Sequence, residues 1–208
     1  MATPHIRPGP RFVEAVAWVT RRHADQARKG GSDVPYLSHL LAVAALVLED
    51  GGDEDDAVIA LCHDLVEDQG GHDRLREIRV RFGDRVADAV AVLSDSAGHH
   101  AEAKEPWPER KSRLLAQLAG PEATESVLRV AAADKLHNAR TILVALRSEG
   151  PRVWERFRPS PAELVWFYRS VADLLADRHP GSANVAELDR VVDELAEWVG
   201  HVEVSRSA

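Results

Sequence analysis

The chain has 208 residues, of which 45% are hydrophobic and 29% are charged, and its formal net charge is −8. This size suits one domain with one core, and the negative charge argues against broad nucleic-acid binding, which needs a basic surface. The single cysteine, Cys62, excludes an internal disulfide framework and a thiolate-rich zinc site.

Apolar residues recur at helical spacing along most of the chain, and no stretch alternates convincingly as a strand would. Residues 1–10 form a tail without the order of a signal peptide, and no apolar run approaches the roughly 20 residues that span a bilayer. We therefore predict a cytoplasmic all-α protein, with a single-domain helical bundle over residues 11–180 and a C-terminal helix within 181–208 packed on the same domain. The expected helices cover residues 12–27, 37–49, 57–68, 75–82, 86–95, 109–118, 122–147, 153–157, 162–177 and 185–202.

The first predicted helix carries His23 on its apolar face. A hydrogen-bonded core histidine is a commoner role at such a position than a metal ligand. A loop follows, because Gly30 and Gly31 stop the helix. Arg28 and Lys29 lie at the start of this loop, where a basic pair can simply complement the helix dipole and stay solvated.

Residues 60–69 concentrate four side chains of the kinds that bind metals, namely His63, Asp64, Glu67 and Asp68. In one continuous helix His63 would sit above Glu67 and Asp64 above Asp68, so that all four would share a face. Burying these groups beside apolar neighbours is costly unless a divalent cation compensates their charge. The alternative is that the stretch is the solvated end of an amphipathic helix.

The second half of the chain adds one further polar group in an apolar setting. Residues 94–108 lack periodicity, and we predict a mobile loop there, in which Trp107 could close over a base or anchor the loop. The long helical segment that follows places Asp134 directly after three alanines, with Asn138 four residues further on. A carboxylate in such surroundings needs a partner, and the spacing points both polar groups at one place.

Two imidazoles and two carboxylates from three predicted helices therefore make a candidate metal site, formed by His39, His63, Asp64 and Asp134. A mixed nitrogen and oxygen set without thiolate suits Mn²⁺, Fe²⁺ or Zn²⁺ and leaves positions open for water and substrate. A metal lowers the pKa of bound water, and a nearby carboxylate can orient that water or accept its proton. The pattern thus predicts a hydrolase.

These motifs resemble the HD-domain metal phosphohydrolases. Within them the chain is similar to the alarmone hydrolases, meaning the hydrolase half of the RelA/SpoT proteins and its stand-alone small relatives such as the metazoan Mesh1 group. The resemblance spans residues 11–178. Its pieces, in family order, are Ala-Arg-Lys at 27–29, Pro-Tyr-Leu-Ser-His at 35–39, His-Asp-Leu-Val-Glu-Asp at 63–68, Phe-Gly-Asp-Arg-Val-Ala at 82–87 and Ala-Asp-Lys-Leu-His-Asn at 133–138.

The resemblance implies a reaction and a separate role for each group of residues around one Mn²⁺ ion. Similar proteins remove the 3′-pyrophosphate of guanosine tetra- or pentaphosphate (ppGpp or pppGpp), giving GDP or GTP. Glu67 and Asp68 would position or activate the attacking water, and which of them moves a proton stays open. The implied metal ligands are His39, His63, Asp64 and Asp134.

The resemblance also implies contacts with a small-molecule nucleotide. Arg28, Lys29 and Asn138 would contact it, which supplies the local basic wall that a phosphate substrate requires in an acidic protein. The basic pair at residues 110–111, Arg110 and Lys111, would face the phosphates or stay solvated. Either Phe167 or Tyr168 could pack on the guanine, and the candidate substrate contacts are Arg28, Lys29, Asn138, Arg110, Lys111 and Tyr168.

Two other functions compete with this one. An HD phosphohydrolase could act on another nucleotide, such as NADPH or a nucleoside phosphate, or the chain could be a non-catalytic nucleotide sensor that retains the metal. Glu67 and Asp68 argue against the sensor, because a protein without turnover is free to lose them. Relatives commonly carry Thr where this chain has Gln69 and Ser94, and both positions lie outside the metal set. The sequence leaves monomer and homodimer undecided.

Overall fold

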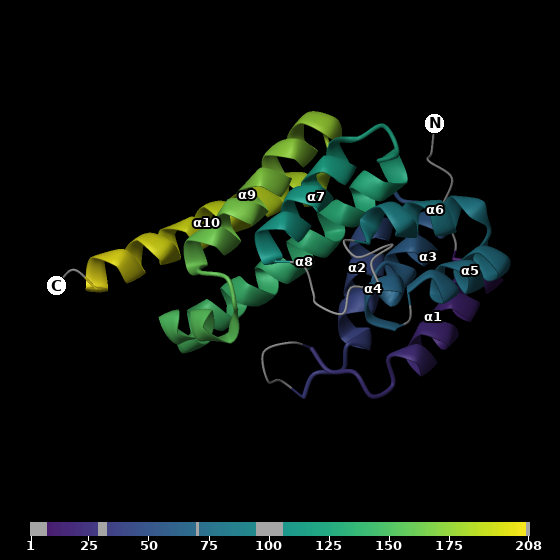
Figure 1. The fold of residues 1–208 in the computed structure, drawn as a ribbon, viewed down its shortest axis with the longest axis horizontal. Helices are drawn as coiled ribbons and strands as arrows, with labels where there is room; N and C mark the ends of the chain where they lie inside the picture. The colour runs from purple at the N-terminus through teal and green to yellow at the C-terminus, as the bar shows by residue number, and fades with distance from the viewer. Residues whose placement is uncertain (1–7, 29–32, 70, 95–105, 207–208) are drawn as a thin grey trace.

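The computed structural model describes residues 8–28, 33–69, 71–94 and 106–206, except for the side chains of residues 68, 69 and 201–206 (Figure 1). Within these ranges the chain is almost entirely helical, and Ala27 and Pro35 form an isolated antiparallel bridge. The prediction of an all-α fold is confirmed. The helices are α1 (Pro10–Arg22), α2 (Leu37–Glu49), α3 (Glu54–Cys62), α4 (Leu65–Gln69), α5 (Gly71–Phe82), α6 (Asp84–Leu93), α7 (Trp107–Ala119), α8 (Glu125–Glu149), the 3₁₀ helix η1 (Pro151–Arg156), α9 (Pro161–Arg178) and α10 (Ala183–Arg206).

Helix α8 is the element on which the N-terminal and C-terminal halves of the chain meet (Figure 1). It contacts α2, α3 and α6 from the first half and α9, α10 and η1 from the second. Its residues 131–133, all alanine, are buried, and their small side chains let neighbouring helices come close to the backbone just before Asp134. An acidic side chain is thereby held in the interior, between the N-terminal and C-terminal parts of the fold.

Several predicted boundaries agree with the structure, and two do not. The bounds of α2 match the prediction, and Ser160 begins α9 with a capping box whose partner is Glu163. Helix α1 ends at Arg22 rather than near residue 27, so His23 caps its end instead of lying on its face. His23 is nevertheless buried, and its Nδ1 lies 2.7 Å from Gln26 Oε1. Residues 95–105, in the predicted mobile loop, lie outside the described ranges.

The second difference concerns the stretch that carries the ligand-type residues. A single helix over residues 57–68 is wrong, because α3 ends at Cys62 and His63 and Asp64 form a turn before α4 begins. The Nδ1 atom of His63 lies 2.7 Å from the carbonyl oxygen of Ala60. In a continuing helix that carbonyl would accept from the amide of residue 64, so the imidazole competes for the same oxygen. His63 and Asp64 therefore project from a turn, not from one helix face.

A buried ion-pair network holds the start of α3 against α6 and α8. Asp53 and Asp56 cap α3 reciprocally, and Asp56, which is 1% exposed, accepts from Arg85 at 2.8 Å and from Arg129 at 2.7 Å. Such a carboxylate satisfies two cations at once. Its removal takes a buried carboxylate away from both guanidinium groups.

We expect Asp56→Ala to lower the free energy of unfolding by about 3 kcal/mol, the lower end for breaking a buried ion pair, because Arg85 stays partly hydrated. Urea denaturation measures this change. Asp88→Ala is the matched control, since its carboxylate is 67% exposed where it pairs with Arg79, and a change below about 1 kcal/mol is expected. Equal effects of the two substitutions would contradict the structural role of Asp56.

The predicted domain boundaries at residues 11 and 180 stay predictions. In the structure, α10 packs against both α8 and α9. Among the described residues, we find no helix that is at once long enough and apolar enough to cross a bilayer.

Candidate metal centre

Three side chains from separate parts of the chain converge on one buried point. His39 comes from α2, His63 from the turn after α3 and Asp134 from the middle of α8. One ligand atom from each lies within 4.8 Å of the other two. The Oδ1 atom of Asp134 is 3.2 Å from His39 Nε2 and 3.6 Å from His63 Nε2. Binding one ion requires these side chains to converge, and the fold brings them together.

Asp64 lies beside the same point. Its Oδ2 atom is 3.0 Å from His63 Nε2 and 3.6 Å from His39 Nε2, and its side chain is 22% exposed. The hydroxyl of Tyr36 donates to this same oxygen, which directs it toward the imidazoles. The structure thus brings all four predicted ligands together, with Asp64 on the side that is open to solvent.

The donor set fits a divalent cation. A backbone carbonyl only accepts hydrogen bonds, so the contact with Ala60 places the proton of neutral His63 on Nδ1. In this neutral form the Nε2 lone pair faces the two carboxylates, and among the described residues this buried nitrogen has no hydrogen-bond partner. A cation at the centre would satisfy this nitrogen and both acids, which is the arrangement that nitrogen and oxygen ligands make around Mn²⁺, Fe²⁺ or Zn²⁺.

The charges of the cluster stabilise one another. Burial alone would raise the pKa of Asp64 and of Asp134, but the neighbouring imidazoles, and for Asp134 also the Lys135 ammonium group, hold both pKa values well below their usual range. Burial alone would lower the pKa of His63, but Asp64 and Asp134 raise it well above its ordinary value, so a cation that binds Nε2 would displace the proton that these carboxylates favour there. Both carboxyl groups are thus ionised, the state in which they bind metal.

A chain of hydrogen bonds links a predicted nucleotide contact to the cluster. Asn138 donates from Nδ2 to Asp134 Oδ1 at 2.6 Å, and its Oδ1 accepts from Arg28 at 2.7 Å. The guanidinium group of Arg28 also lies over the ring of Tyr36, 5.7 Å from its centroid. Arg28 and Asn138 are therefore adjacent to the cluster. Lys29 lies outside the described residues.

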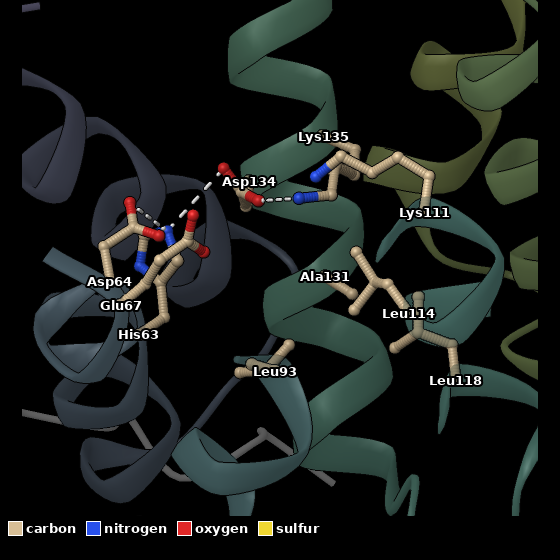
Figure 2. Close-up of a pocket in the computed structure, with 10 residues that line it drawn as sticks. All are labelled: His63, Asp64, Glu67, Leu93, Lys111, Leu114, Leu118, Ala131, Asp134 and Lys135. Atoms are coloured by element: carbon tan, nitrogen blue, oxygen red, sulfur yellow. Dashed lines mark hydrogen bonds and ion pairs between the residues drawn. The ribbon is translucent and has the colours of Figure 1, made fainter. Parts of the chain in front are cut away.

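A small pocket, partly open to solvent, adjoins the cluster, and Figure 2 shows its lining. Glu67 enters it from α4, and Lys111 and Lys135 enter it from α7 and α8. The Nη1 atom of Arg110 lies 4.0 Å from Glu67 Oε1. The pocket thus has an acidic side next to the candidate metal ligands and a cationic side facing it. The side chain of Asp68 lies outside the described residues.

The aromatic candidates on α9 are buried. Phe167 packs edge-on against Trp107, with ring centroids 5.8 Å apart, and Lys111 Nζ lies 5.2 Å from the centre of its ring. Trp107 therefore anchors the start of α7. Burial raises the pKa of Tyr168 to about 12, although the nearby Lys135 ammonium group opposes the shift. In the part of the chain that the structure describes, neither Phe167 nor Tyr168 lines the pocket.

Three side chains at the site were not predicted from the sequence. Tyr36 bonds to Asp64, Lys135 forms an ion pair with Asp134, and His137 places its Nδ1 atom 2.8 Å from Nδ1 of His39. Burial and the neighbouring His39 lower the pKa of His137 to about 4, so this ring is neutral. Tyr36, Lys135 and His137 all lie within the motifs at 35–39 and 133–138. Their closeness along the sequence to predicted ligands was the signal that could have identified them.

Comparison with known proteins identifies the class. The HD-domain family matches residues 15–159, and the chain belongs to this family. Its curated relatives include the guanosine-3′,5′-bis(diphosphate) 3′-pyrophosphohydrolase MESH1 of Xenopus tropicalis, 31% identical over 133 residues, and the human MESH1, 33% identical over the same length. Each alignment covers 63% of this chain and 69% of the relative. The resemblance to the stand-alone alarmone hydrolases of the RelA/SpoT type is thereby confirmed.

A solved structure agrees with the helical architecture. A metazoan ortholog of SpoT, described as hydrolysing ppGpp, superimposes with a TM-score of 0.70 over 96% of this chain and 99% of its own, at 24% identity. At that identity the likeness establishes the fold.

Proposed function

We propose that this chain hydrolyses ppGpp and pppGpp at the 3′ position, releasing pyrophosphate and leaving GDP or GTP. The observation that carries the proposal is the convergence of His39, His63, Asp64 and Asp134 beside a pocket with one acidic and one cationic side. The activity named for the MESH1 relatives supports the choice of substrate.

The four converging side chains are proposed to hold one Mn²⁺ ion. When bound, such an ion supplies a Lewis acid that offsets phosphate charge and makes water a better nucleophile near neutral pH. The imidazoles present Nε2 and the two aspartates present one oxygen each, and Tyr36 and Asn138 orient these two carboxylates through their hydrogen bonds. Supporting hydrogen bonds of this kind raise the affinity of a metal site.

Glu67 is proposed to orient the attacking water and accept its proton, with Asp68 as its partner. The Glu67 side chain is 26% exposed where it lines the pocket, so water reaches it. It comes from α4, directly after the turn that carries two of the proposed ligands, and in the proposal it lies beside the reacting phosphorus. The Nη1 atom of Arg110, 4.0 Å from Glu67 Oε1, places a cation beside this side chain.

The phosphates are proposed to lie on the cationic side of the pocket. Lys111 and Lys135 line it, and Arg28 reaches the cluster through Asn138. Lys29 extends this wall in the proposal. Phosphoryl transfer depends mainly on positioning and charge compensation, which these side chains supply in an otherwise acidic protein. A nucleotide contact for Tyr168 stays a prediction, because its ring is buried beside Lys135 and is not part of the described pocket lining.

A nucleotide panel tests the proposal. Purified protein is loaded with Mn²⁺ and offered ppGpp, pppGpp, NADPH and nucleoside monophosphates, and pyrophosphate and orthophosphate are measured separately. We expect pyrophosphate together with GDP or GTP, and no turnover after chelation of the metal. Mn²⁺, Fe²⁺ and Zn²⁺ are compared in the same assay, and Mn²⁺ is expected to support the highest rate.

The other outcomes of the panel separate the rival functions. Orthophosphate released only from NADPH or a monophosphate identifies a different HD phosphohydrolase. Tight binding of ppGpp without any product identifies a sensor. Either result contradicts the proposed reaction.

A further inference from the structure

His137 contacts a candidate metal ligand from outside the metal set. It lies on α8, three residues after Asp134, and it is half-buried. Its Nδ1 atom is 2.8 Å from Nδ1 of His39, and the two ring centroids are 4.9 Å apart. The opposite nitrogen of His39, Nε2, faces Asp134 Oδ1 at 3.2 Å and Asp64 Oδ2 at 3.6 Å. His39 therefore lies between the cluster on one side and His137 on the other.

The short contact between the two Nδ1 atoms allows two arrangements of the protons. A neutral imidazole has one N–H group and one lone pair, and one of the two facing nitrogens must donate. If His39 donates, its Nε2 carries the lone pair and can bind a metal. If His137 donates, the proton of His39 sits on Nε2 and points at Asp134, which blocks coordination. The role of His137 thus decides whether His39 can be a ligand at all.

We propose that His137 accepts a hydrogen bond from His39 Nδ1 and thereby holds His39 in the tautomer that binds metal through Nε2. His137 is then a positioning residue that acts through His39 and touches neither metal nor substrate. The inference rests on the proposed metal site, and it is independent of which nucleotide is cleaved.

The contrast with the second histidine of the cluster strengthens this assignment. The tautomer of His63 is determined by the backbone carbonyl of Ala60, an acceptor that no substitution removes. The corresponding nitrogen of His39 faces a side chain instead. The same face of α8 therefore supplies one ligand, Asp134, and the hydrogen-bond acceptor for another, because residues three apart are neighbours on a helix. Loss of such a supporting partner costs a metal site about 10- to 100-fold in affinity.

Two substitutions of similar shape test the proposal. Asparagine presents Oδ1 near the place of the histidine Nδ1 and can accept the bond, whereas leucine has the same branching and no acceptor. Mn²⁺ affinity of the metal-free proteins is measured by isothermal titration calorimetry. We expect His137→Leu to bind about 10- to 100-fold more weakly, and His137→Asn to retain most of the wild-type affinity. His72→Leu, at an exposed histidine of α5, is the control and should bind like the wild type.

Each other outcome has a defined meaning. Wild-type affinity in His137→Leu, or equal losses in the leucine and asparagine variants, overturns the proposal, since neither result depends on an acceptor. A wild-type protein that binds no Mn²⁺ overturns the metal centre itself, together with this role. If the leucine variant does not fold, ¹⁵N spectra of the Zn²⁺-loaded wild type decide: an unprotonated Nδ1 on His137 supports the proposal, and a protonated one overturns it.

Discussion

Asp64→Ala is expected to abolish tight Mn²⁺ binding and to reduce turnover of ppGpp by about 10³-fold, because a bound metal contributes several kcal/mol to transition-state stabilisation and each 1.4 kcal/mol is tenfold in rate. The substitution removes the carboxylate oxygen that lies 3.0 Å from His63 Nε2. The two imidazoles and Asp134 remain, but the site loses one of its two negatively charged ligands. Bound manganese is measured by elemental analysis and turnover by pyrophosphate release.

The control for Asp64→Ala is Asp88→Ala on α6. Its carboxylate is exposed and is not among the described residues that line the pocket, so metal content and rate should not change. Circular dichroism verifies that both variants are folded. Full turnover in the Asp64 variant would falsify the assignment of this residue to the metal centre.

Glu67→Gln is expected to keep the metal and to lower kcat by about 10² to 10⁴-fold, the range that a positioned general base contributes. Glutamine preserves the length and shape of the side chain and cannot accept a proton at neutral pH. Because Glu67 lies in the pocket and outside the three-residue cluster, Mn²⁺ affinity and KM should change far less than kcat. Steady-state kinetics and metal titration measure these quantities separately.

The matched control for Glu67→Gln is Glu77→Gln on α5, where the carboxylate pairs with Arg22 and Arg74 and does not line the pocket. It should behave like the wild type. If Glu67→Gln turns over at the wild-type rate, Glu67 is not the base, and the same experiment on Asp68 becomes the test of the remaining candidate.

Local pattern was sufficient for most of the helices. The bounds of α2 follow from its run of apolar residues between Tyr36 and Asp50, and Ser160 followed by proline begins α9 as expected. These features depend on neighbouring residues along the chain. The break between α3 and α4 does not follow from such a pattern, because it coincides with the contact between the His63 side chain and a backbone carbonyl.

The four candidate ligands could be predicted from the sequence because their residue types are rare in apolar surroundings. Asp134 among alanines is conspicuous in the sequence. The partners that orient the ligands are less conspicuous, since Tyr36 and His137 are ordinary helix-end and helix residues, 28 and 98 positions away from the side chains that they contact. Spacing along one segment cannot reveal pairings that only the packing of α2 against α3 and α8 creates.

The position of the ligands along the chain ties ion binding to folding. Residues 39, 63, 64 and 134 belong to segments that meet only when α2, α3 and α8 are packed, so an unfolded chain has no comparable site. An ion that binds only the native state adds to the free energy of unfolding, by about 2.7 kcal/mol at a free concentration one hundred times Kd. An ion held by these residues would therefore stabilise the native fold as well as take part in the chemistry, and its removal by chelation should lower the melting temperature.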